Sequence, residues 1–172
     1  YISVGDDHVT VLAGRGEAGR LYNMPSKNVT VRNNILGTGM GLSIGSSVSG
    51  GVEDVLYFNN TMHETREHLG QGVNLKTRIG IGGYVKNVVW DSNVYFSTGT
   101  EAILIETDYQ SDGSCDGETC TRVEGIVLRN LGFHNSSTPG RIVCSEKQPC
   151  SNITFDNIQI NGFVRDEWGK CD

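Results

Sequence analysis

Alternating apolar and polar residues recur along this chain in short segments that start in the same way. Each begins with Asn, Asp or Gly and continues with every second residue apolar; they begin at Asn28, Asp54, Asn87, Gly125 and Asn152. A period of two is typical of strands with one buried and one exposed face. Because Asn tolerates left-handed backbone at turns, we expect the segments to start at stacked corners that form a polar ladder.

A second, shorter set of alternating segments lies between these copies, at 41–46, 72–77, 102–107 and 141–146. Segments this short cannot bury a face alone, but stacking them creates a continuous apolar column. We therefore expect an all-β fold, a right-handed parallel β-helix whose turns, about five in number and ~4.8 Å apart, make a rod roughly 25 Å long. A β-sandwich is the alternative, although it does not explain the repeated Asn start.

Composition supports short strands rather than helices. The 172 residues include 23 Gly and 3 Pro, and Gly and Asn are poor helix formers. We expect one domain over residues 1–172, the C-terminal portion of a longer protein, because the chain opens inside a strand pattern without a signal peptide. An uncapped solenoid exposes strand edges, which would permit self-association through its ends.

The formal net charge of −6 and the lack of a basic run exclude nucleic acid as the expected partner. No apolar stretch is long enough to cross a bilayer, so no membrane partner is expected either. The residues suggest no cofactor and no metal site. An acidic protein can still bind an acidic polymer where its cleft is locally basic.

The five cysteines include two close pairs, Cys115 with Cys120 and Cys144 with Cys150. Local disulfides that close short loops are the favoured reading; a zinc site is the alternative, but no His lies near either pair. Cys171 is left over, with a partner beyond the chain or in another molecule.

Four N-x-S/T sequons, at Asn28, Asn59, Asn135 and Asn152, accompany the paired cysteines. Together they indicate a secreted, extracellular glycoprotein.

Three other features carry less weight. His63 and His68 are spaced i, i+5 and so do not share a helical face for zinc, while Trp90 and Trp168 could stack on sugars or pack in the core.

Asp6 and Asp7 stand next to each other just before an alternating strand. Gly-Asp is a common turn pair, which is the plain interpretation. Hydrolysis of a glycosidic bond needs one protonated and one ionised carboxyl group, so the pair is also a candidate for catalysis.

Further motifs follow this pair in a recognisable order. GMGLSIG lies at 39–45, GVNLKT at 72–77 and Tyr109 after the next strand, followed by both cysteine pairs. In these segments the chain resembles the polygalacturonases, family 28 of the glycoside hydrolases. The resemblance implies a parallel β-helix of the cell wall, inverting hydrolysis, and a pectin-like acidic polysaccharide as the partner. By position it implies Asp6 as the acid, Asp7 as a base, Lys76 as the cation for a galacturonate carboxylate and Tyr109 at the sugar.

The chain also departs from the family pattern. The family His of Gly-His-Gly is Met40 and the Arg of Arg-Ile-Lys is Asn74, while the segment that supplies another base would precede Tyr1. The Cys that usually follows the acidic pair is His8, and its usual partner falls near Leu36. Met cannot hydrogen-bond as His does, and Asn cannot replace the bidentate Arg.

Two residues could compensate for these losses. His8, next to the acidic pair, is a candidate for substrate contact or else a packed His. Arg78 would share a strand face with Lys76 and could supply the missing charge; a solvated surface Arg is the alternative. The sequence therefore favours a polygalacturonase-like hydrolase, with a catalytically silent polysaccharide-binding β-helix and a fibre-forming structural β-helix as alternatives.

Overall fold

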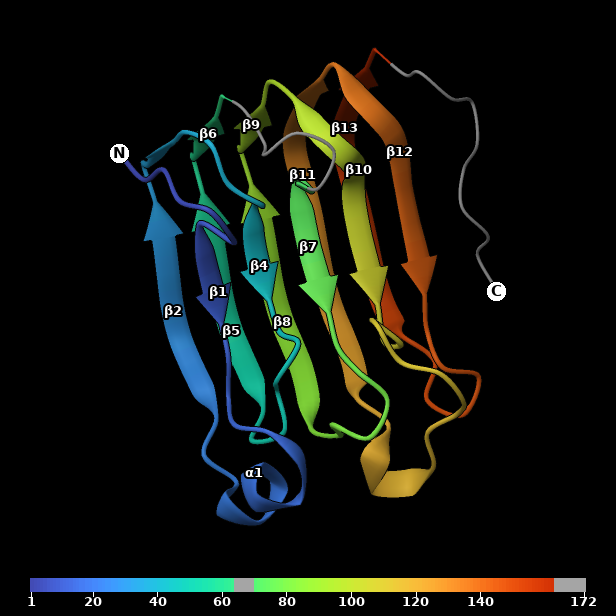
Figure 1. Cartoon of the computed structure of the whole chain (residues 1–172). Coiled ribbons are helices and arrows are strands. Elements are labelled where there is room, and N and C mark those ends of the chain that lie inside the picture. The colour runs from blue at the N-terminus through green and yellow to red at the C-terminus, as the bar shows by residue number, and fades with distance from the viewer. Residues whose placement is uncertain (64–69, 163–172) are drawn as a thin grey trace.

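A computed structural model describes residues 1–63 and 70–162. Two parallel sheets face each other, and the chain winds from one to the other through five successive turns (Figure 1). All strand pairs between named strands are parallel, which fits a β-helix and excludes the antiparallel β-sandwich. The expected fold class is confirmed.

The smaller sheet takes one strand from each turn. Its strands in spatial order are β1 (Val9–Val11), β4 (Leu42–Ile44), β7 (Val73–Lys76), β10 (Thr98–Glu106) and β12 (Ser136–Val143). Equivalent residues stack directly: Val9 pairs with Leu42, Leu42 with Val73, and Val73 with Ile103. Because the register keeps side-chain direction constant, one face of this sheet is apolar and the other carries the polar residues.

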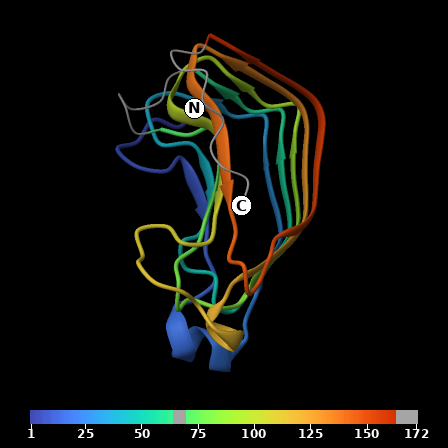
Figure 2. The same cartoon turned by 90° about the vertical axis from the view of Figure 1, so that its right-hand side faces the viewer.

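The larger sheet contains the segments that begin with Asn, Asp or Gly. Its strands are β2 (Ser26–Arg32), β3 (Ile35–Leu36), β5 (Val52–Phe58), β6 (Thr61–Met62), β8 (Tyr84–Asp91), β9 (Val94–Tyr95), β11 (Arg122–His134) and β13 (Ser151–Asn161). The long β11 pairs with β8 through its first half and with β9 through its second, so the sheet bends (Figure 2).

The predicted corners are confirmed by the backbone. Asn28, Asp54, Asn87, Gly125 and Asn152 all have positive φ, between 53° and 67°, at equivalent positions of successive turns. The Asn87 amide donates to Asp54 Oδ1 at 3.1 Å, which is one rung of the expected ladder. These residue types therefore set where each turn of the helix changes direction.

Besides its many aliphatic side chains, the interior contains stacks of aromatic residues and of asparagines. Trp90 is fully buried and lies parallel to Tyr57, with ring centroids 5.0 Å apart, so its place is in the core. The Asn60 amide donates to Asn93 Oδ1 at 2.9 Å, and both side chains are buried. Stacking of this kind lets each turn satisfy the polar groups of the next.

Two short helices lie at one end of the sheets, between consecutive strands. They are α1 (Gly16–Tyr22) and the 3-10 helix η1 (Gly117–Thr119). Neither these helices nor any other described part of the chain forms a helix that is long and apolar enough to cross a bilayer.

Candidate active site

The acidic pair lies at the start of the first turn, beside the polar face of the smaller sheet. Thr10 in β1, Ser43 in β4 and Asn74 in β7 are register partners on this face. Neighbouring positions in each strand belong to the apolar core. The alternation in three separate segments thus delivers polar side chains from three turns to one surface.

Asp7 is the most densely bonded group of this surface. Lys76 Nζ lies 3.0 Å from its Oδ2 and 3.3 Å from its Oδ1. The hydroxyls of Ser43 and Thr10 donate to Oδ1 at 2.7 Å and to Oδ2 at 3.0 Å. The side chains of Asp7 and Lys76 are only 11% and 12% exposed, so water screens this ion pair weakly.

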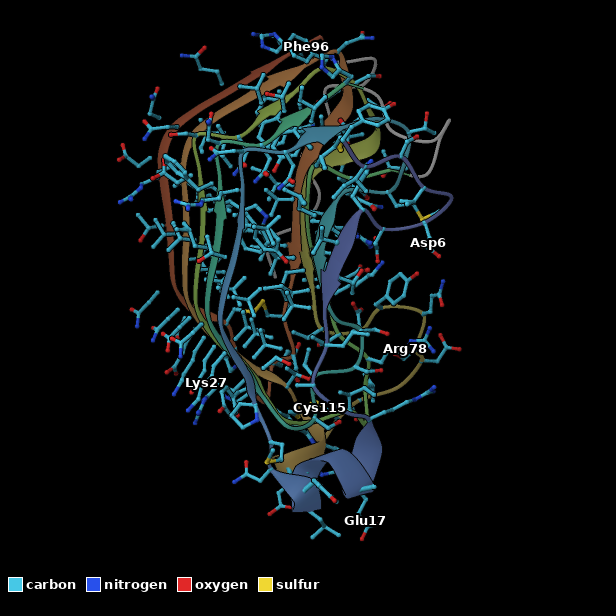
Figure 3. All side chains as sticks on the ribbon, turned by 90° about the vertical axis from the view of Figure 1, so that its left-hand side faces the viewer. Asp6, Glu17, Lys27, Arg78, Phe96 and Cys115 are labelled. Atoms are coloured by element: carbon cyan, nitrogen blue, oxygen red, sulfur yellow. A yellow bond between two sulfur atoms is a disulfide. The ribbon has the colours of Figure 1, made fainter. Side chains whose placement is uncertain are left out.

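Asp6 contrasts with its neighbour because it is exposed. Its Oδ1 accepts the Asp7 backbone N–H at 2.7 Å, and its backbone carbonyl accepts the Met40 N–H at 2.9 Å. Asp6 and Arg78 lie on the same side of the molecule, opposite Lys27 (Figure 3). The pair therefore consists of one accessible carboxyl group and one carboxylate that is held by neighbours.

A surface groove of ≈ 400 Å³ joins these groups to an aromatic ring. Asp6, Asp7, Leu12, Lys76, Arg78 and Tyr109 are among the residues that line it. The Lys76 ammonium and the Arg78 guanidinium lie 5.3 Å and 5.5 Å from the centroid of the Tyr109 ring. Two carboxyl groups, two cations and one aromatic ring thus meet in one open groove, an arrangement suited to an anionic sugar chain.

Arg78 lines this groove from a loop rather than from the strand face that was expected. The strand β7 ends at Lys76, so Arg78 lies in the following loop rather than on the same strand. Its Nη2 donates to Gln110 Oε1 at 2.8 Å, and Gln110 Nε2 lies 2.9 Å from Tyr109 Oη. The loops after β7 and β10 therefore hold the guanidinium and the ring together.

His8 and Asn74 take up positions behind the groove. His8 is buried: its Nε2 lies 2.9 Å from the Gly37 carbonyl, and its Nδ1 accepts the Gly41 N–H at 3.2 Å. Asn74 is 1% exposed and its amide donates to Ser43 Oγ at 3.1 Å. Neither side chain lines the groove of the acidic pair.

One ionisable cluster on the same face of the smaller sheet was not predicted from the sequence. Glu106 pairs with Lys76 in the register and forms an ion pair of 2.5 Å with Arg141. Burial raises the pKa of the Glu106 carboxyl, and the Arg141 charge opposes this only in part. The partners are 35 residues apart, so only the stacking of turns reveals the contact.

The cysteine pairs and sequon residues that were predicted from the sequence do not line the groove. The two expected disulfides, Cys115–Cys120 and Cys144–Cys150, are present. The sequon residues Asn28, Asn59, Asn135 and Asn152 are all exposed. The predictions on His68, Trp168 and Cys171 fall outside the described residues.

Comparison with known proteins places this chain in a family. The family model described as glycosyl hydrolases family 28 matches residues 1–172. The chain belongs to this family. A polygalacturonase of Ralstonia solanacearum is 30% identical over 95% of the chain and 30% of its own length, and a probable polygalacturonase of Vitis vinifera is 30% identical over 94% and 33%. The chain spans about a third of the length of these curated relatives.

A solved structure agrees on the fold of this family 28 chain. The exopolygalacturonase of Thermotoga maritima superposes with a TM-score of 0.61 at 24% identity, covering 91% of this chain and 39% of its own. At this identity the likeness concerns the fold alone.

Proposed function

We propose that the protein hydrolyses α-1,4-galacturonan of pectin by inversion, with its reaction centre at the groove of Asp6, Asp7, Lys76 and Tyr109. The observation that carries the proposal is the pairing of one accessible and one held carboxyl group beside two cations in a single groove. The names of the relatives in Ralstonia solanacearum and Vitis vinifera support the same substrate class.

The roles follow from what each carboxyl group contacts. Asp6, in its protonated form, donates its proton to the glycosidic oxygen as the bond from the anomeric carbon to that oxygen breaks. Asp7, already an ionised acceptor of Lys76, takes a proton from the water that attacks the anomeric carbon from the opposite face. The product has the opposite anomeric configuration, and Tyr109 offers a ring face for the sugar.

His8 and Asn74 serve this centre as positioning residues rather than as substrate contacts. His8 ties the turn that carries the acidic pair to the Gly37–Gly41 segment through both ring nitrogens. Asn74 donates to Ser43, and Ser43 donates to Asp7. This chain of donors reaches Asp7 from the interior and orients its carboxylate.

A catalytically silent polysaccharide-binding protein is the second candidate. Met40 and Asn74 stand where the family pattern has His and Arg, and Asp7 is already paired with Lys76. Three donors, the Lys76 ammonium and the hydroxyls of Ser43 and Thr10, already occupy this carboxylate. Such a protein would bind the polysaccharide in the groove through its cations without hydrolysing it.

Proton NMR of polygalacturonate incubated with the full-length protein tests the first proposal against the second. We expect the new reducing ends to appear first as the β-anomer, because inversion of an α-linkage gives β. Initial formation of the α-anomer would contradict inversion. Unchanged polymer, with the protein retained in a polygalacturonate affinity gel, would favour the silent binding protein.

We also propose that the protein acts outside the cell, at the pectin of the cell wall. Two disulfides and four exposed sequon residues support an oxidising, glycosylating route. Treatment of the natural protein with a peptide N-glycosidase should lower its apparent mass. An unchanged mass would contradict glycosylation.

A further inference from the structure

The groove contains two cations, and one of them already forms an ion pair with a carboxylate of the protein. Lys76 Nζ contacts both oxygens of Asp7, at 3.0 Å and 3.3 Å, and both side chains are nearly buried. A sugar carboxylate could bind Lys76 only by competing with Asp7. Lys76 is therefore better placed to hold Asp7 than to distinguish a charged sugar from a neutral one.

The position in β7 that carries a cation in the family pattern offers none here. Asn74 is buried, and its amide donates to Ser43 Oγ at 3.1 Å and to Gln71 Oε1 at 3.3 Å. It carries no charge and does not line the groove. A carboxylate in the groove must be recognised by another residue.

Arg78 lines the groove and is available to bind a carboxylate of the substrate. Within 1–63 and 70–162 it forms no ion pair, whereas Lys76, Lys86, Arg129 and Arg141 each face a carboxylate. Its Nη2 donates to Gln110 at 2.8 Å, and its guanidinium lies over the Tyr109 ring at 5.5 Å. The arginine is thus held in the groove by neutral partners.

The loop geometry fixes these partners in turn. The Tyr109 backbone N–H donates to the Thr77 carbonyl at 2.9 Å, which ties the loop after β10 to the loop after β7. Gln110 bridges Tyr109 Oη and the guanidinium. A planar guanidinium has five N–H donors in a fixed fork, so one bond to Gln110 leaves donors for a planar carboxylate.

We propose that Arg78 is the specificity-determining residue that recognises the free carboxylate of a uronic acid in this groove, and that Gln110 is its positioning residue. The inference rests on the proposed function, because it names the substrate group that the same groove selects. The ligand class is a polymer of de-esterified uronic acids. Methyl esterification removes the charge and with it the preferred partner of Arg78.

The experiment measures binding separately from turnover. In the full-length protein carrying Asp6→Asn, affinity electrophoresis gives the dissociation constants for polygalacturonate and for highly methyl-esterified pectin. We expect Arg78→Gln to weaken binding of polygalacturonate roughly 10- to 100-fold and to leave binding of the esterified polymer nearly unchanged. Binding of polygalacturonate by the Arg78→Lys variant should fall between that of the parent protein and that of Arg78→Gln, because Lys keeps the charge and loses the forked set of donors.

Two further variants sharpen the test. Arg32→Gln removes the same charge from an exposed position in β2 of the other sheet, and binding should not change. Gln110→Ala should weaken binding of polygalacturonate but not of esterified pectin, a selectivity that a general loss of structure would not produce. Equal weakening of both polymers by Arg78→Gln, no weakening of either, or no binding of polygalacturonate by the parent protein would overturn the proposal.

Failure of the proposed function would look different. If the protein with an intact Asp6 releases no sugar while Arg78→Gln still weakens polygalacturonate binding selectively, the hydrolase is wrong and the recognition by Arg78 stands. If sugar is released from both polymers and Arg78→Gln changes neither dissociation constant, the hydrolase stands and the recognition is wrong.

Discussion

Lys76 Nζ lies 3.0 Å from Asp7 Oδ2, although the two residues are 69 positions apart in the chain. The contact joins the first turn of the β-helix to the third and passes over Ser43 of the second, which donates to the same carboxylate. Three turns thus converge on one carboxyl group. The ion pair links the stability of the fold to the chemistry of the groove.

Lys76→Met should test this link. The variant leaves the nearly buried Asp7 carboxylate with only its two hydroxyl donors, so we expect a loss of about 1–3 kcal/mol in the free energy of unfolding together with a loss of hydrolysis. Urea unfolding followed by circular dichroism measures the first effect. Lys86→Met is the matched control: it breaks a more exposed pair with Glu53 in the other sheet and should cost less stability than Lys76→Met. Equal losses in the two variants would contradict the special place of Lys76.

His8→Phe should destabilise the turn of the acidic pair. The buried imidazole bonds the Gly37 carbonyl and the Gly41 N–H, and a benzyl side chain leaves both unpaired. We expect a loss of about 2–4 kcal/mol in the free energy of unfolding and a lower kcat. His134→Phe, at an exposed position stacked on Phe96, should change neither. If both variants resembled the wild type, the positioning role of His8 would be wrong.

Asn93→Ala should show how much the interior asparagine ladder contributes. Asn93 Oδ1 accepts both the backbone N–H and the amide of Asn60 at 2.9 Å, and its own amide donates to the Tyr57 carbonyl at 2.9 Å. With these buried groups unpaired, we expect a loss of about 2–4 kcal/mol, measured by urea unfolding. Asn34→Ala at the partly exposed end of the same ladder should cost less, because water can replace its bonds. A larger loss at Asn34 would contradict this account.

Glu106→Gln should change the pH dependence of stability. Burial raises the pKa of Glu106 above its ordinary value of 4.5, so the folded protein binds this proton more tightly than the unfolded chain does. The contribution of Glu106 to stability is then fully present below that ordinary value and is lost as pH rises through the folded pKa. The difference in unfolding free energy, wild type minus variant, should therefore decrease as the pH rises above the ordinary pKa of a Glu carboxyl.

Glu53→Gln provides the control of opposite sign. The hydrogen bond from Lys86 lowers the pKa of Glu53, so its contribution is present above the ordinary pKa and is lost as pH falls through the folded one. Urea unfolding at a series of pH values should show that the difference in unfolding free energy, wild type minus variant, changes with pH in opposite directions for Glu106→Gln and Glu53→Gln. Changes in the same direction would show that the two carboxyl groups do not differ as described.

The sequence predicted the features that depend on a repeated local signal. Asn28, Asp54 and Asn87 each start an alternating segment, and each occupies left-handed backbone at the same corner. A local signal repeated five times overcomes the ambiguity of any one copy. The short β3, β6 and β9 and the seven-residue α1 were not predicted, because two-residue strands and a single short helix have no period to detect.

Five of the candidate residues chosen from the sequence line one groove, whereas the contacts between them could not be predicted. Asp6, Asp7, Lys76, Arg78 and Tyr109 were candidates, and the structure brings all five to one groove. Which cation pairs with Asp7 depends on how turns of unequal length stack, and this information is not local. The contact between Glu106 and Arg141 remained hidden for the same reason, since each side chain alone is an ordinary charge on an alternating strand.

Release of reducing ends from polygalacturonate by the full-length protein, compared with its Asp6→Asn variant, tests the central claim most directly. Asp6 is exposed and contributes little to the core, so the variant should fold as the wild type does, which thermal unfolding can verify. We predict steady release by the wild type and a loss of at least about 100-fold in the variant, the contribution typical of a general acid. Absence of release by a folded wild type, or equal release by the two proteins, would contradict the assignment of Asp6 as the acid of this groove.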